Sequence, residues 1–225
     1  MSQVSSGPSA RNAQGPSLQR RPLQFLADVN NSFMRLHLGA IPELEGCAPD
    51  ESWKPLREPG PVLMQCFALP LGVAACGALV LLWIHLTPVT KTPVVSPILL
   101  GAVMVAIFPV HEIIHAAVHP GAGKSPSSIL GLWPSRLLFY AHYGGELSRN
   151  RFITVLGMPL LVISVVPLLI AVLIGHASVT IAFASAFNAL AAGGDIFAIC
   201  LLLIQVPGAA TVRNHGWKTY WKRSH

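Results

Sequence analysis

The residues His111, Glu112 and His115 form the pattern His-Glu-x-x-His inside an apolar stretch of the chain. Side chains four positions apart lie on one face of a helix, so both imidazoles would point the same way. Two imidazoles placed like this can bind a zinc ion, and the adjacent glutamate can act as a base on a water molecule at the metal. Because a charged residue at membrane depth is costly, a glutamate retained there indicates a functional role.

A catalytic zinc site needs a third protein ligand and an open position for water. We expect Asp195 to be that ligand, because it is a lone carboxylate in a later apolar segment and would offset part of the metal's charge. The alternative is that Asp195 caps a helix or pairs with a cation. His142 and Glu146 could form an alternative ligand set or a shell around the ligands, and the other interpretation is that they belong to a solvated loop. His119 is expected to lie at the membrane surface.

Asn188 lies seven residues before Asp195, two helical turns away on nearly the same face. Its amide could bind the substrate backbone or a developing oxyanion, which would make it a catalytic residue. It could equally join two helices through a side-chain hydrogen bond. The intervening Gly193 and Gly194 would let the helix bend or let another backbone approach closely.

The composition is that of a membrane protein. Charged residues make up only 11% of the 225 residues, the mean hydropathy is +0.57, and soluble domains have about 25% charged residues. Six of the nine carboxylates precede residue 59, so the apolar remainder keeps only Glu112, Glu146 and Asp195. None of the four cysteines forms a Cys-x-x-Cys pair, which argues against a thiolate zinc site.

Four apolar stretches each reach the ~20 residues that a membrane-spanning helix needs. They cover residues 62–86, 97–118, 152–175 and 178–206. The sequence therefore predicts an all-α integral membrane bundle of about four transmembrane helices. In the loop between the second and third helices, residues 137–143 have strand-forming composition and precede the turn signal Gly144-Gly145. A short β-hairpin there could pair with an extended peptide, and the alternative is an ordinary loop.

The remaining segments divide the chain into four parts. Residues 1–22 are predicted to be a disordered tail, and residues 23–61 a cytoplasmic amphipathic segment and linker, with a short helix over 23–37. Residues 62–206 are predicted to form the four-helix transmembrane domain that carries the His-Glu-x-x-His pattern, and residues 207–225 a basic and aromatic cytoplasmic tail. Basic residues alternate between loops in a way that predicts both termini in the cytoplasm. Membrane lipid accounts for the net charge of +6, so no nucleic-acid partner is expected.

The same residues carry a resemblance to known families. The sequence HEIIH in the second stretch, with an Asn and an Asp in the fourth, resembles the site-2 protease type of intramembrane zinc metalloprotease. The tract GELSRNRFI at 145–153, followed by Met158-Pro159, is similar to a family of small multi-pass putative zincin peptidases. Together the similarity covers about residues 97–206. Site-2 proteases usually have a proline-rich turn before their Asp, and this chain has Ala-Leu-Ala-Ala-Gly-Gly-Asp instead.

The resemblance implies roles for five residues. His111, His115 and Asp195 would bind zinc, Glu112 would be the general base, and Asn188 would assist the substrate. We therefore expect an intramembrane zinc metallopeptidase of the cell (cytoplasmic) membrane, acting on transmembrane or membrane-associated peptides. The alternative is a non-catalytic metal-binding membrane protein, such as a sensor, a carrier or an inactive adaptor. Two histidines and a carboxylate would also suit iron.

Overall fold

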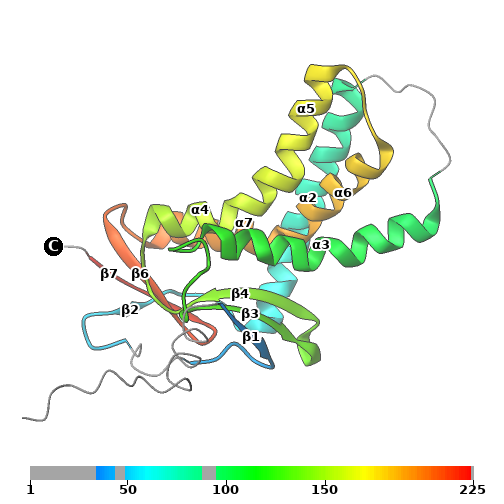
Figure 1. Ribbon diagram of the computed structural model, residues 1–225. Coiled ribbons are helices and arrows are strands. Elements are labelled where there is room, and N and C mark those ends of the chain that lie inside the picture. The colour runs from blue at the N-terminus through cyan, green and yellow to red at the C-terminus, as the bar shows by residue number, and fades with distance from the viewer. Residues whose placement is uncertain (1–33, 44–48, 88–94, 224–225) are drawn as a thin grey trace, which may run out of the picture. The chain divides into compact units, whose positions relative to one another are not determined.

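The computed structural model describes residues 34–43, 49–87 and 95–223, which belong to one compact unit. In this unit the helices lie together and two small β-sheets lie beneath them (Figure 1). The predicted disordered tail, and most of the predicted amphipathic helix over 23–37, lie outside the described residues.

The helices follow the four apolar stretches closely. They are α2 (Pro61–Leu86), α3 (Pro97–Val118), α4 (Arg149–Pro159), the π-helical segment η2 (Leu160–Val165), α5 (Val166–Ile174), α6 (Val179–Ala191) and α7 (Gly193–Gln205). Within the described ranges, the run Arg149–Ile174 is one of three helices long and apolar enough to cross a membrane. The pair α6 and α7 is bent by 47°, and counting it as one span gives four.

Strands correct the expectation of an all-α fold. The first sheet has the order β1-β3-β4, and the second the order β2-β7-β6-β5. The strands are β1 (Arg35–Leu38), β2 (Lys54–Pro55), β3 (Ser128–Trp133), β4 (Leu138–Tyr143), β5 (Glu146–Ser148), β6 (Ala210–His215) and β7 (Lys218–Arg223). Most of the described residues are nevertheless helical, so the helical part of the prediction holds.

The hairpin predicted between the second and third long helices is confirmed, but its turn lies elsewhere. Strand β4 pairs antiparallel with β3, which precedes it, so the turn covers Pro134–Arg136 and Leu137. Gly144 and Gly145 instead separate β4 from β5. The first sheet also gains β1, parallel to β3, at residues that the sequence assigned to the end of the amphipathic helix.

The C-terminal residues form a hairpin where the sequence suggested a basic tail. In β6, Ala210 and Val212 are 1% exposed and pack with Leu202 and Val206 of the α7 end. The intervening side chains, including Arg213, turn away from this core. Only alternate residues of a strand reach the core. The basic residues between them dominate the composition of residues 207–225, so the alternation typical of a strand was not recognised in the sequence.

Helix α2 crosses the bent pair at a very close backbone contact. A Cβ atom added at Gly193 would overlap the carbonyl oxygen of Ala68, and one added at Gly72 would overlap that of Leu190. The next residue, Gly194, has no atom within 4 Å of the position where a Cβ would lie. Close approach of α2 is therefore what requires glycine at position 193, whereas position 194 has space for a side chain.

This difference gives a matched pair of variants. We expect Gly193→Ala to lower stability by about 1–3 kcal/mol, because α2 must move away from the bend. We expect Gly194→Ala to be neutral or to stabilise by up to ~1 kcal/mol, because alanine favours helix. Thermal unfolding of the two variants in the same detergent measures this, and equal midpoints would show that the contact with α2 is not tight.

Candidate metal centre

Three side chains with metal-binding atoms come together from two helices. His111 and His115 project from α3, and Asp195 projects from the first turn of α7. Asp195 oxygens lie 2.9 Å from His111 Nε2 and 3.4 Å from His115 Nε2, and the two Nε2 atoms are 3.1 Å apart. The structure thus brings together the three residues that the sequence named as ligands.

The imidazole of His115 is oriented by a carbonyl group that a proline leaves free. His115 Nδ1 lies 2.8 Å from the carbonyl oxygen of Val155 in α4. In a regular helix that oxygen would accept a hydrogen bond from residue 159, but Pro159 has no N–H to donate. Since a carbonyl can only accept, His115 must donate from Nδ1, and its Nε2 then presents a lone pair to the centre.

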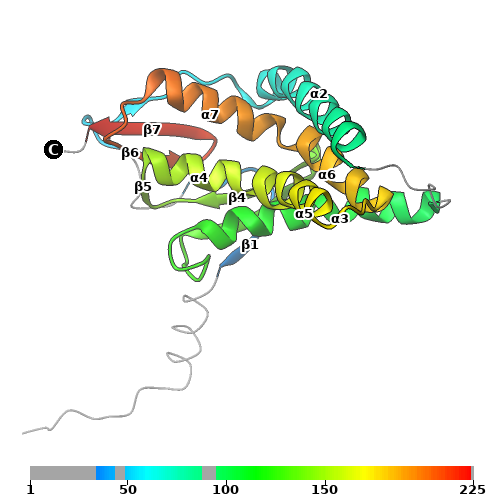
Figure 2. The ribbon, with the colours of Figure 1, turned by 90° about the horizontal axis from the view of Figure 1, so that it is seen from above.

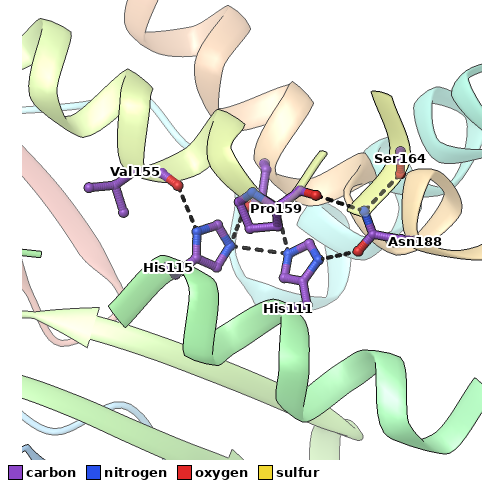
Figure 3. Close-up of polar contacts among 7 residues, drawn as sticks. His111, His115, Val155, Pro159, Ser164 and Asn188 are labelled. Carbon is purple, nitrogen blue, oxygen red and sulfur yellow. Dashed lines mark hydrogen bonds and ion pairs between the residues drawn. The ribbon is translucent and has the colours of Figure 1, made fainter. Parts of the chain in front are cut away.

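The imidazole of His111 is oriented through Asn188, which is completely buried. The Asn188 amide nitrogen donates to the Pro159 carbonyl oxygen at 3.1 Å and to Ser164 Oγ at 2.9 Å. Because the carbonyl can only accept, the amide orientation is fixed and Oδ1 faces His111 Nδ1 at 2.9 Å (Figure 3). His111 therefore also donates from Nδ1 and presents the Nε2 lone pair to the centre.

Three acceptors consequently face one another, which suits a metal cation. Two imidazole lone pairs and a carboxylate would repel one another unless a cation lay between them. Their separations of 2.9, 3.1 and 3.4 Å are near the ~3.3 Å expected between tetrahedral ligands at ~2.0 Å from zinc. The donor set and its fixed tautomers therefore fit a divalent metal ion.

The bend between α6 and α7 determines where Asp195 and Asn188 lie. Helix α6 ends at Ala191 and α7 begins at Gly193, so Asn188 is in the last turn before the bend and Asp195 in the first turn after it. The two side chains contact opposite ring nitrogens of His111. A carboxylate in the first turn of a helix is also favoured by the partial positive charge of that terminus.

Glu112 lies beside the cluster and faces the first sheet. A cavity of about 260 Å³ is lined by Glu112 together with the three ligand side chains. The backbone N–H of Ala141, in β4, faces the Glu112 carboxylate. Glu112 and Phe139 also line a second, apolar cavity of about 380 Å³ between α3 and strands β1 and β3. The glutamate therefore stands where the two cavities adjoin.

The alternative ligands named from the sequence lie outside the cluster. Glu146 is paired with Arg213 and with Lys222 on the second sheet. His142 is buried, and its Nε2 has no hydrogen-bond partner among the described residues. Burial lowers the pKa of His142 to about 4, so its ring is neutral at pH 7.

His119 is the residue that sequence reasoning misplaced. It was expected at the membrane surface, but it is only 2% exposed and lines the cavity of the three ligands. Its Nδ1 lies 3.2 Å from Ser128 Oγ, and burial lowers its pKa to about 4. The signal that could have found it is its spacing, since His119 follows His115 by four residues as His115 follows His111.

Comparison with known proteins links this region of the chain to a family. Residues 104–211 match the model of a family described as putative zincin peptidase. The resemblance to that family is thereby confirmed. No curated protein and no solved structure matches the chain. The matched region contains His111, Glu112, His115, Asn188 and Asp195, so the whole cluster lies within it.

Metal content tests the cluster directly. We expect about one divalent ion per chain in detergent-purified protein, and its loss in His111→Ala, His115→Ala and Asp195→Ala, because each change removes one of three ligands. Elemental mass spectrometry measures this, with His142→Ala as the control that keeps its metal. Metal retained in Asp195→Ala would contradict the assignment of the third ligand.

The orienting role of Asn188 gives a second test. Asn188→Leu leaves His111 Nδ1 without its acceptor, and we expect metal affinity to fall about 10–100-fold, as for other residues that orient ligands. Competition with a chelating dye measures the affinity. Ser164→Ala, which removes one of two partners of the amide nitrogen, should give a smaller loss. Unchanged affinity in Asn188→Leu would show that the tautomer is fixed in another way.

Proposed function

We propose that the protein is an intramembrane zinc metallopeptidase that hydrolyses peptide bonds in membrane-embedded or membrane-proximal substrates. The observation that carries this proposal is the convergence of three oriented acceptors on one point beside Glu112. The family match adds support, since its description is that of a peptidase of the zincin type. Zinc is the metal we favour, because neutral imidazoles and one carboxylate form a usual catalytic zinc set.

A zinc ion in this cluster would polarise the scissile carbonyl group and make a nearby water molecule more acidic. Glu112 is then the residue that takes the water proton and delivers it to the leaving amine. Its position supports this role, since Glu112 lines the same cavity as the three candidate ligands but does not belong to their cluster. The Ala141 N–H that faces its carboxylate would hold the side chain in place.

The first sheet offers an edge on which an extended peptide could lie. Gly144 N donates to Ser127 O, so the alternation of the antiparallel β3–β4 pairing directs the backbone groups of Phe139 and Tyr143 away from β3. No described strand pairs with this edge of β4. A substrate added as a further strand would pass the ligand cavity, which β4 lines along most of its length.

The position in the membrane is part of the proposal. The metal ligands lie in the last two turns of α3 and the first turn of α7, beside the two sheets. The predicted excess of basic residues on the side of both termini supports a cytoplasmic location for the sheets. We therefore propose a multi-pass protein of the cytoplasmic membrane whose active site opens toward the cytoplasmic leaflet.

Replacement of the base separates catalysis from metal binding. We expect Glu112→Gln to retain its metal and to reduce peptide hydrolysis at least ~100-fold, because the amide cannot accept the water proton. Substrates would be identified by quantitative comparison of membrane-protein fragments in cells that express the wild type or the variant.

Glu51→Gln is the matched control, since Glu51 is an exposed carboxylate in a turn distant from the cluster in the sequence. It should produce the same fragments as the wild type. A Glu112→Gln variant that cleaves at the wild-type rate would refute the mechanism. Metal bound without any cleavage by the wild type would favour the non-catalytic alternative of a sensor, carrier or adaptor.

A further inference from the structure

A cavity with cationic and apolar lining lies at the other end of α7, away from Asp195. It has a volume of about 770 Å³. Its lining comes from strands β2 and β7, from the segment that leads to α2, and from the last turn of α7. The lining residues are Lys54, Pro55, Arg57, Ile204, Gln205 and Trp221. In Figure 2 the chain between β2 and α2 runs alongside α7, which places the cationic segment next to this helix.

The backbone positions of both cations are fixed by contacts within the protein. The Gln205 side chain accepts a hydrogen bond from Arg57 N at 2.9 Å and donates one to Arg57 O at 3.1 Å. Lys54 pairs in register with Trp221, and its Nζ lies 5.5 Å from the centroid of a Trp221 ring. A ligand would therefore meet cations whose attachment points are already ordered, which lowers the entropy cost of binding.

No described carboxylate forms an ion pair with the two cations of this cavity. None of the ion pairs found in the described part of the chain involves Lys54 or Arg57. The nearest carboxylate in sequence, that of Glu58, is hydrogen-bonded to Thr219. The carbonyl end of α7 contributes a partial charge of about −0.5, which two full positive charges outweigh. The cavity thus attracts an anion.

On the side of Ile204 the lining of the cavity is apolar, and this apolar surface continues onto the outer surface of the helices. Ile204 is 81% exposed and Leu203 is 55% exposed in the last turn of α7. At the start of α2, Val62 and Leu63 are also more than half exposed. Helix α2, and α6 with α7 taken as one bent span, are long and apolar enough to cross a membrane, where acyl chains would cover such surfaces. The cations therefore lie where the apolar surface ends, which is the level of lipid headgroups.

From these contacts we propose that the cavity binds the headgroup of an anionic phospholipid. Its phosphate would lie between Lys54 and Arg57, and its acyl chains would pass along Ile204 and Leu203. The planar guanidinium of Arg57 can make two parallel hydrogen bonds to phosphate oxygens. The exposed Ile204 distinguishes a lipid from a free phosphate ion, because only the lipid has an apolar part to cover it. The site does not depend on the proposed peptidase activity.

Native mass spectrometry of the full chain, stripped of lipid in detergent, tests this site. The probes are dioleoylphosphatidylglycerol and dioleoylphosphatidylcholine, which share their acyl chains and differ in net charge. We expect the wild type to bind the anionic phosphatidylglycerol more tightly than the zwitterionic phosphatidylcholine. The double variant Lys54→Ala/Arg57→Ala should weaken binding of the phosphatidylglycerol by roughly 10- to 30-fold, given the usual effect of a cation at the membrane surface.

The control is the double variant Arg35→Ala/Lys124→Ala, which removes two exposed cations elsewhere. It should bind the anionic lipid within about twofold of the wild type, and circular dichroism confirms that both double variants are folded. Equal binding of the two lipids, or equal binding by the cavity variant and the wild type, would overturn the proposal. Displacement of the lipid by millimolar inorganic phosphate would show a free-anion site instead of a lipid site.

Discussion

The geometry of the metal cluster depends on one missing hydrogen-bond donor. Pro159 has no N–H, so the Val155 carbonyl remains available to His115, and the carbonyl of Pro159 itself holds the Asn188 amide that orients His111. In an apolar layer each polar group needs a partner, and a histidine tautomer is determined by what its second nitrogen meets. One proline in α4 thus sets both imidazoles, and the π-helical segment begins directly after it.

The other half of the cluster depends on the bend between α6 and α7. A straight helix would place Asn188 and Asp195 two turns apart, about 10 Å along its axis, whereas here both contact the ring of His111. The bend forms without a proline, next to Gly193, where α2 crosses too closely for any side chain. The position of Asp195 therefore depends on the packing of α2, because a displacement of α2 would also move the start of α7, which carries Asp195.

The two sheets contribute polar groups to two separate cavities at the ends of the helices. Near the end of α3, strand β4 lines the ligand cavity and faces Glu112 with a backbone N–H. At the end of α7, strands β2 and β7 hold Lys54 and Trp221 beside the last apolar turn. The first arrangement would suit the proposed peptidase, and the second would suit the proposed phospholipid site. Both rely on strands to fix side chains at the boundary of the apolar helices.

Much of this protein can be predicted from its sequence, because long apolar runs and the spacing of two histidines are local signals. These signals predict the helices within a few residues and identify His111, Glu112, His115 and Asp195 as the candidate site. The sequence did not predict strand β1 at residues 35–38 or the hairpin of β6 and β7 in the basic tail, because such short strands are specified by partners distant in the sequence. Tertiary contacts alone establish that Asn188 orients the ring of His111, that His119 lines the cavity, and that Pro159 frees the carbonyl for His115. These roles depend on contacts between different elements, and the spacing of residues along one helix does not reveal such contacts.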